Sequence, residues 1–289
     1  MKGIALGTVQ FGLPYGVANR HGQPSLTQVA DILAVAKAAG INTLDTAISY
    51  GSSEERLGAV GIDGWRVVSK LPSIPNGVAD IEFWVKEAVY GSLRRLQIDS
   101  LYGLLLHHPD DLLEDRGNVL FQVIENLKQC GLVKRIGVSI YDPSQLIRLL
   151  SRFKFDLVQA PFNVVDRRLL KNGYLSQLNQ EKIEIHTRST FLQGLLLLNS
   201  ETRPEKFSRW QGLWDVWESW LQFHDVSALQ TCLSFALNQQ GIERVLVGVD
   251  TVEQLEEILA IPVTTIPTPP STICTDDIDL INPSRWSNL

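Results

Sequence analysis

Apolar positions along this 289-residue chain fall into two alternating patterns. Short apolar runs, several of them rich in β-branched residues, predict strands, and longer segments with apolar residues three or four positions apart predict helices. Eight strand-like runs can be counted, and each is followed by a helical segment. The strands are expected at residues 4–6, in the run ending at Asp45, and at residues 66–70, 101–106, 135–139, 156–159, 183–185 and 244–248.

The segments between these runs carry helix signals. Ser25 is placed to cap a helix that runs to Ala39 and stops at Gly40, and Ser53 is placed to cap the helix after the second strand. A longer insert precedes the helix expected near residue 227. The remaining helices are expected at residues 81–96, 119–130, 143–151, 166–180, 227–238 and 252–259.

Strands that alternate with helices imply a parallel sheet with helical crossovers. Eight such units over this length favour a closed (β/α)8 TIM barrel, in the α/β class, over an open doubly wound sheet. We therefore assign residues 1–261 to a single barrel domain. Residues 262–289 hold several prolines and little periodicity, so we expect an irregular C-terminal tail that packs on the barrel.

Four polar residues come together if the barrel forms. Asp45, Lys70 and His107 lie at or just past the carboxyl ends of strands two, three and four, where enzyme sites in this fold collect. Tyr50 follows Asp45 in the loop. A phenol titrates near pH 10, roughly, unless a cation lies close, and Lys70 is the candidate cation. A single residue of this kind is more often a surface or core residue, but four in register form a stronger signal.

Charge and composition exclude several classes of partner. The chain has 26 basic and 32 acidic residues, and the basic ones are scattered rather than gathered in a stripe, so no nucleic-acid partner is expected. No apolar run reaches about 18 residues, so no membrane span or secretion signal is predicted and we expect a cytoplasmic protein. Cys130, Cys232 and Cys274 are far apart, which favours free thiols over a disulfide frame or a metal site.

The segments LDTAISYGSSEERLG, VVSK, LLLHHP, IGVS and VQAPFN resemble the aldo-keto reductase family in order and spacing, from about Gly3 to Leu259. The resemblance implies an NAD(P)-dependent oxidoreductase that interconverts a carbonyl (aldehyde, ketone or sugar lactol) and an alcohol by hydride transfer. It also implies a barrel that binds NAD or NADP in extended form, and the absence of a GxGxxG fingerprint agrees with that.

The family's catalytic tetrad matches Asp45, Tyr50, Lys70 and His107. The resemblance implies that Tyr50 donates a proton to the carbonyl oxygen and that Lys70 favours loss of that proton. Asp45 would keep Lys70 charged, and His107 would orient the carbonyl. His108 matches a variable position.

The cofactor residues match the family less closely. Ser139 and Gln159 match the residues that hold the nicotinamide carboxamide, but Ile140 replaces the usual asparagine. Arg188 replaces an aromatic residue that often stacks on the nicotinamide ring; a guanidinium can stack as well, but less favourably beside the cationic oxidised ring. The expected cofactor wall is completed by Gly7, Thr8, Asp45, Ser189, Phe191 and Gln193, with Ser189 to Gln193 on the pyrophosphate path. The alternative is that this last segment only closes the barrel rim.

The adenosine end departs furthest from the family pattern. Gly248 and Gln254 stand where NADP-dependent relatives carry a lysine and an arginine, and Asp250 and Glu257 are nearby. A phosphate there would lack charge-assisted hydrogen bonds. The sequence therefore leans to NAD.

A small-molecule carbonyl or sugar-like substrate is expected. Apolar candidates for its site are Phe11, Trp84, Trp210, Trp214, Trp217 and Trp220. The last four are near helical spacing, so the alternative is a helix docked on the barrel by its tryptophan face.

Two other functions remain open at this point. The departures at Ile140, Arg188, Gly248 and Gln254 allow a non-catalytic, cofactor-binding barrel that acts as a sensor or partner subunit. A lyase or isomerase that uses Lys70 as a Schiff base is the third possibility, but it leaves Asp45 and Tyr50 without a role.

Overall fold

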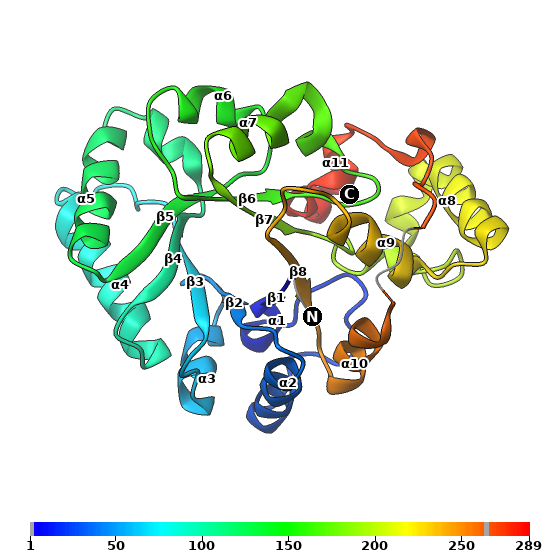
Figure 1. Ribbon diagram of the computed structural model, residues 1–289, viewed down its shortest axis with the longest axis horizontal. Helices are drawn as coiled ribbons and strands as arrows, with labels where there is room; N and C mark the ends of the chain where they lie inside the picture. The colour runs from blue at the N-terminus through cyan, green and yellow to red at the C-terminus, as the bar shows by residue number, and fades with distance from the viewer. Residues whose placement is uncertain (1–2, 263–265) are drawn as a thin grey trace.

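The computed structural model describes residues 3–262 and 266–289, and its centre is a closed barrel of eight parallel strands (Figure 1). Each strand pairs with the next in the chain, and β8 pairs with β1, which confirms the predicted TIM barrel. The strands are β1 (Ile4–Gly7), β2 (Thr43–Asp45), β3 (Arg66–Leu71), β4 (Leu101–Leu106), β5 (Val133–Ser139), β6 (Leu157–Pro161), β7 (Glu184–Arg188) and β8 (Arg244–Gly248).

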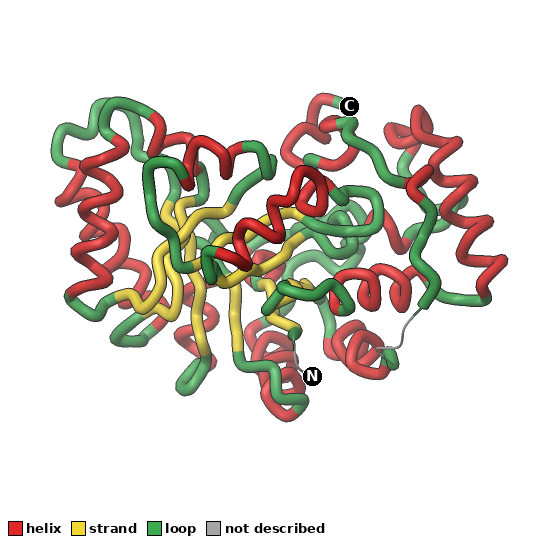
Figure 2. Tube along the Cα trace, turned by 45° about the horizontal axis from the view of Figure 1, so that its top comes forward, coloured by secondary structure: helices red, strands yellow, loops and turns green. Residues whose placement is uncertain are grey.

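Helices surround the strands, as the red and yellow segments of Figure 2 show. They are α1 (Val9–Gly12), α2 (Leu26–Ala38), α3 (Ser53–Val60), α4 (Ile81–Leu96), α5 (Gly117–Gln129), α6 (Gln145–Leu150), α7 (Tyr174–Gln180), α8 (Gln211–His224), α9 (Ala228–Leu237), α10 (Val252–Ala260) and α11 (Ile278–Ile281). No helix in the described residues is long and apolar enough to cross a membrane.

Local signals set most helix boundaries, with two differences from expectation. Ser25 caps α2 as predicted, in a capping box with Gln28. Ser53 is not a cap: it is the first residue of α3, and its buried hydroxyl donates to the carbonyl oxygen of Thr8 (2.9 Å). The helix expected at residues 166–180 is interrupted, because Asn172 takes a left-handed conformation (φ 53°) before α7 begins.

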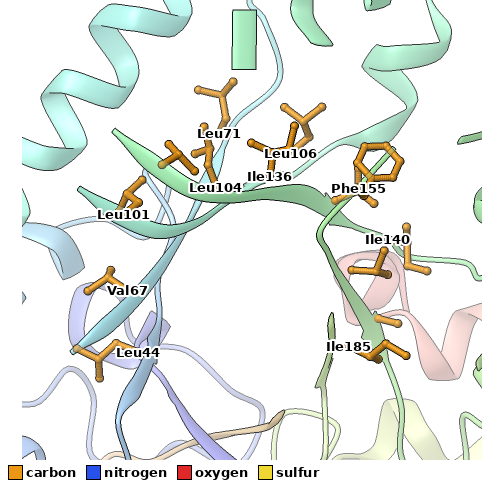
Figure 3. Packing of buried hydrophobic residues seen from close by; sticks show 14 of the residues in the cluster. Leu44, Val67, Leu71, Leu101, Leu104, Leu106, Ile136, Ile140, Phe155 and Ile185 are labelled. Atoms are coloured by element: carbon orange, nitrogen blue, oxygen red, sulfur yellow. The ribbon is translucent and has the colours of Figure 1, made fainter. Parts of the chain in front are cut away.

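Apolar side chains form one layer outside the strands and another inside them. Figure 3 shows the outer layer, in which residues such as Leu44, Leu104 and Ile185 point away from the barrel interior. Inside, Val68, Leu105 and Leu157 pack together. The barrel is therefore a filled core, and ligands can approach only at its ends.

Polar residues close the barrel interior near the amino ends of the strands. Glu184 accepts a hydrogen bond from the Tyr102 hydroxyl (2.6 Å), pairs with Arg135 (3.0 Å) and contacts His186 Nε2 (2.9 Å). Burial raises the pKa of Glu184, but the hydrogen bonds from His186 and Tyr102 and the charge of Arg135 outweigh it and lower the pKa to about 2. The carboxylate is therefore ionised and well compensated.

The insert between β7 and α9 has its own apolar core. Trp210, Trp214 and Trp217 are buried there, and the indole N–H groups of Trp214 and Trp217 donate to main-chain carbonyls. This is a helix docked through its tryptophan face. Trp220 is half-buried and stacks on Trp217.

The C-terminal tail contributes to the same core. Ile273, Leu280, Ile281 and Trp286 are buried with the insert tryptophans, and Figure 1 shows α11 on the same side of the molecule as α8. The tail also contacts the loop after β6, where Thr275 N–H donates to the carbonyl of Val165 (3.0 Å). Within the expected tail, residues 263–265 lie outside the described residues.

Candidate active site

Asp45 at the end of β2, Tyr50 in the loop after β2 and Lys70 on β3 form one hydrogen-bonded chain. Lys70 Nζ donates to Asp45 Oδ1 (2.8 Å), to the carbonyl oxygen of Thr46 (2.9 Å) and toward the hydroxyl of Tyr50 (3.4 Å). The side chains of Lys70 and Asp45 are almost fully buried, at 1% and 4% exposed. The structure thus brings Asp45, Tyr50 and Lys70 together at the carboxyl ends of the strands.

The ammonium group of Lys70 is stabilised although it is buried. Burial alone lowers the pKa of Lys70, but the charge of Asp45 and interactions with Tyr50 outweigh it, and the pKa is raised above its ordinary value. Lys70 therefore stays cationic, with Tyr50 as the neighbour that faces the cavity.

His107 follows β4 and stands edge-on to Tyr50, with ring centroids 5.9 Å apart. Burial, and then the charges of Lys70, His108 and Arg188, lower the pKa of His107 to about 3. The imidazole is neutral at physiological pH, so it has one donor and one acceptor nitrogen. Its Nδ1 lies 3.3 Å from the Ser49 hydroxyl, which leaves Nε2 for a ligand.

Close packing of two loops fixes the position of Tyr50. A side chain at Gly12 would put its Cβ 1.7 Å from the carbonyl oxygen of Tyr50, and one at Gly51 would lie 2.4 Å from the carbonyl oxygen of Gly12. Gly51 also has a positive φ of 54°. Because only glycine allows this approach, the loop after β2 is held against α1 with the phenol turned to the cavity.

A cavity of about 800 Å³ opens at this end of the barrel, within the usual size of ligand sites. Tyr50 and His107 line it, while Lys70 does not. All residues predicted to bind the cofactor also line it: Gly7, Thr8, Asp45, Ser139, Gln159, Arg188, Ser189, Phe191, Gln193, Gly248, Asp250, Gln254 and Glu257. None of the apolar substrate candidates does, so that interpretation of Phe11, Trp84 and the insert tryptophans was wrong.

The ends of β5 and β6 are linked to the buried ion pair. Ser139 Oγ donates to Gln159 Oε1 (3.3 Å), and Gln159 Nε2 donates to Asp45 Oδ1 (2.7 Å). Asp45 therefore accepts from both Lys70 and Gln159.

The loop after β7 takes an unusual backbone path along the cavity. Ser189, Leu192 and Gln193 all have positive φ, which is uncommon outside glycine. The side chain of Gln193 donates to the hydroxyl of Tyr15 (2.9 Å), and so ties this loop to the loop after α1. Such backbone conformations gather at functional sites.

The far end of the cavity is acidic. Asp250 N–H donates to Gln254 Oε1 (2.7 Å), and Asn19 Nδ2 donates to Asp250 Oδ1 (3.1 Å). Burial raises the pKa of Asp250, against smaller opposing effects of His21 and Gln254. Among the described residues, Arg188 is the only lysine or arginine that lines the cavity, so no such cation lines its far end.

Gly248 leaves room for a glutamine side chain in the cavity wall. A Cβ at this position would lie 2.4 Å from Gln10 Nε2. Gln10 Oε1 is buried and has no hydrogen-bond partner among the described residues. Gln10 Oε1 is therefore a buried, unsatisfied acceptor beside the cavity wall.

Sequence reasoning missed several lining residues. Tyr15, Asn19 and Gln10 come from the segment after β1, Tyr141 follows β5, and residues 282–284 come from the tail. The glycine-rich segment after the first strand was a weak signal for the first three. The others carry no local pattern, because only the packing of distant loops places them here.

Within residues 3–262 and 266–289, no three His, Cys, Asp or Glu side chains are placed to hold a metal ion. The three cysteines are free thiols.

Comparison with known proteins places this site in a family. The chain belongs to the aldo/keto reductase family, which matches residues 3–268. An uncharacterized oxidoreductase of Bacillus subtilis, YqkF, is 26% identical over 239 residues, which cover 75% of this chain and 76% of the relative. An NADH-specific methylglyoxal reductase of Escherichia coli is 25% identical over 275 residues, covering 80% of this chain and 81% of the relative.

Solved structures agree in fold. The aldo-keto reductase AKR11C1 from Bacillus halodurans, in its holo form, superimposes with a TM-score of 0.72 at 21% identity, covering 92% of this chain and 88% of that one. At this identity the likeness concerns the fold alone.

Family membership decides among the three functions left open by the sequence. The chain is an enzyme, an NAD(P)-dependent oxidoreductase that interconverts carbonyls and alcohols. The comparisons give no support to a non-catalytic barrel. A Schiff base at Lys70 is also disfavoured by position, because its amine is buried behind Asp45 and does not line the cavity.

Proposed function

We propose that this enzyme reduces a small aldehyde, ketone or sugar lactol with NADH, and that Tyr50 is the proton donor. The observation that carries this proposal is the chain from Asp45 through Lys70 to Tyr50, beside a neutral His107, in the wall of a cavity that can take a cofactor. Among the described residues that line the cavity, no other group combines a proton to give with a buried cation behind it.

The cavity wall suits a nicotinamide cofactor, which supplies the hydride when it is bound. Ser139 and Gln159 hold the carboxamide in this proposal, through polar groups that now bond each other. Gly7 and Gly248 line the cavity, and a Cβ at Gly248 would lie 2.4 Å from Gln10 Nε2. The residues after β7 line the path to the acidic end.

Residues of the chain supply the proton for the carbonyl oxygen and stabilise the negative charge that remains on Tyr50. His107 donates from Nε2 to the carbonyl oxygen and orients it. Tyr50 gives its proton to that oxygen while negative charge develops there, so a full alkoxide never forms. Lys70 stabilises the phenolate that is left, and Asp45 keeps Lys70 charged. In the oxidative direction the tyrosinate is the base.

We propose NAD rather than NADP as the cofactor. A 2′-phosphate at the far end would meet Asp250 and Glu257 and no lysine or arginine. Ribose hydroxyls, in contrast, can donate to a carboxylate. The name of the Escherichia coli relative, an NADH-specific methylglyoxal reductase, supports the same choice.

The substrate end of the cavity is polar and aromatic. Tyr15, Tyr141 and His107 offer ring faces and hydrogen-bonding groups, which suits a small oxygen-rich carbonyl compound such as a sugar. Residues 282–284 complete the wall, so we also propose that residues 262–289 act as an extension of the 1–261 barrel. The free cysteines support a reducing compartment such as the cytoplasm.

The test removes only the proton donor. Tyr50→Phe should lower kcat by about 10²-fold to 10⁴-fold, the usual contribution of a general acid, while the Kd for NADH stays within about twofold. Tyr90→Phe is the matched control, because its hydroxyl lies on the exposed face of α4, away from the cavity. Full activity of Tyr50→Phe would refute the assignment.

A further inference from the structure

Arg188 brings a positive charge into the cavity that no carboxylate balances. Its guanidinium donates to the carbonyl oxygen of Ile140 (3.0 Å) and to the Ser189 hydroxyl (3.3 Å), and it lies 4.7 Å from the centre of the Tyr141 ring. All three partners are neutral. Within residues 3–262 and 266–289, no Asp or Glu oxygen is within 4.0 Å of it.

The other charged groups at this end of the cavity cancel or are absent. Asp45 and Lys70 form an ion pair and together add no net charge. His107 is neutral near pH 7, because burial and nearby cations hold its pKa at about 3. Arg188 therefore leaves this end with one uncompensated positive charge, while the carboxylates of Asp250 and Glu257 lie at the adenosine end.

The guanidinium is held beside the residues proposed to bind the nicotinamide carboxamide. Arg188 is the last residue of β7, opposite Pro161 at the end of β6. Its hydrogen bond to Ile140 brings it to the residue that follows Ser139. The stack on Tyr141 and the bond to Ser189 restrict its movement, so the charge is fixed in place.

A fixed cation at this place distinguishes the two redox states of the cofactor. The oxidised nicotinamide ring carries a positive charge and the reduced ring is neutral, while the rest of the cofactor is unchanged. A guanidinium repels the oxidised ring, most strongly where water is excluded. The reduced form meets no such repulsion.

We infer that Arg188 makes the cavity selective for the reduced, uncharged nicotinamide, so that this enzyme binds NADH more tightly than NAD⁺ and works as a reductase. The inference rests on the proposed function. In that direction the carbonyl carbon gains a hydride from NADH and its oxygen gains the proton of Tyr50. Alcohol and NAD⁺ leave, and solvent returns a proton to Tyr50. Repulsion by Arg188 then favours release of the oxidised product.

Equilibrium binding tests this without turnover. The Kd values of NADH and NAD⁺ are measured by titration calorimetry for the wild-type enzyme and for Arg188→Met, Arg188→Gln and Arg188→Lys. The ratio of the NAD⁺ Kd to the NADH Kd should be well above one in the wild type. It should fall about tenfold in the two neutral variants, which corresponds to about 1.4 kcal/mol, and stay within about threefold in Arg188→Lys.

Lys134→Met is the matched control for loss of one positive charge. Lys134 is exposed near the start of β5, at the opposite end of the barrel, and should leave the ratio unchanged. A wild-type ratio near one, or a ratio that survives in neutral variants shown to be folded by circular dichroism, would overturn the inference. Failure of the wild type to bind either NADH or NAD⁺ would instead refute the proposed function on which the inference rests.

Discussion

The sharpest prediction concerns His107, which should stay neutral far below the pH at which histidines usually titrate. Its pKa is lowered from 6.5 to about 3, first by burial and then by the charges of Lys70, His108 and Arg188. At pH 5 an ordinary histidine is about 97% protonated, whereas His107 should be about 1% protonated. This large difference is easy to measure.

The assay is an NMR titration of ¹⁵N-labelled imidazoles between pH 4 and 8, with the His107 signals assigned through His107→Gln. The signals of His107 should not move between pH 5 and 8, and near pH 4 they should show only about a tenth of the full titration shift. The same chain unfolded in urea is the control, because all of its histidines should then titrate near pH 6.5, roughly. Lys70→Met should raise the pKa of His107, since it removes one of the causes that lower it.

The same property should appear in catalysis. A neutral imidazole donates a hydrogen bond equally well across this range, so kcat/KM should show no inflection from His107 between pH 5 and 8. His107→Gln, which keeps a neutral donor, should retain more activity than His107→Leu, which has none. An inflection between pH 5.5 and 7 that disappears in His107→Gln would show that the imidazole is protonated in this range and that the reasoning from burial and charge is wrong.

Two further predictions concern the far end of the cavity and the closed end of the barrel. Gln254→Arg should improve NADPH binding relative to NADH by about tenfold, because a cation at this position can pair with the 2′-phosphate. Glu256→Arg, on the exposed face of α10, is the control and should not change this ratio. Calorimetry with both cofactors measures the ratio, and equal effects of the two variants would show that the phosphate binds elsewhere. Glu184→Gln should destabilise the fold by about 2 to 3 kcal/mol at pH 7. The fall of its carboxyl pKa from 4.5 to about 2 on folding corresponds to about 3.4 kcal/mol, and partial exposure of the group reduces this figure. A group whose pKa is lowered in the folded state stabilises the fold at pH values above its unfolded pKa. In urea unfolding, the stability of the wild type should therefore fall as the pH drops from about 4.5 toward 2, and Glu184→Gln should lack that part of the decline. An identical pH profile for the two proteins would contradict the assignment.

The sequence by itself determined the architecture and the strand ends that form the candidate active site. The eight apolar runs and the periodicity of the helices are local properties, so they predict a closed parallel barrel before any contact is known. Asp45, Lys70 and His107 could be placed for the same reason, because a residue at the end of an apolar run lies at the end of a strand. Closure of the barrel then brings adjacent strand ends together.

Local signals failed where distant segments compete for a residue. Ser53 is of a residue type that often caps helices, but its hydroxyl donates to the carbonyl oxygen of Thr8, just after β1. The insert tryptophans have a spacing that suits either a ligand surface or a docked helix. Burial against Leu280 and Trp286 of the tail gives them the second role, and no pattern within the insert contains that information.

Only the tertiary structure decided the electrostatics of the cavity. The neutral state of His107 depends on burial and on the charges of Lys70 on β3, His108 after β4 and Arg188 on β7. The unbalanced charge of Arg188 depends on which carboxylates reach it. Such energies are set by distance and by exclusion of water between residues far apart in the chain. The sequence could therefore name the groups that surround Tyr50, but their charge states follow only from the fold.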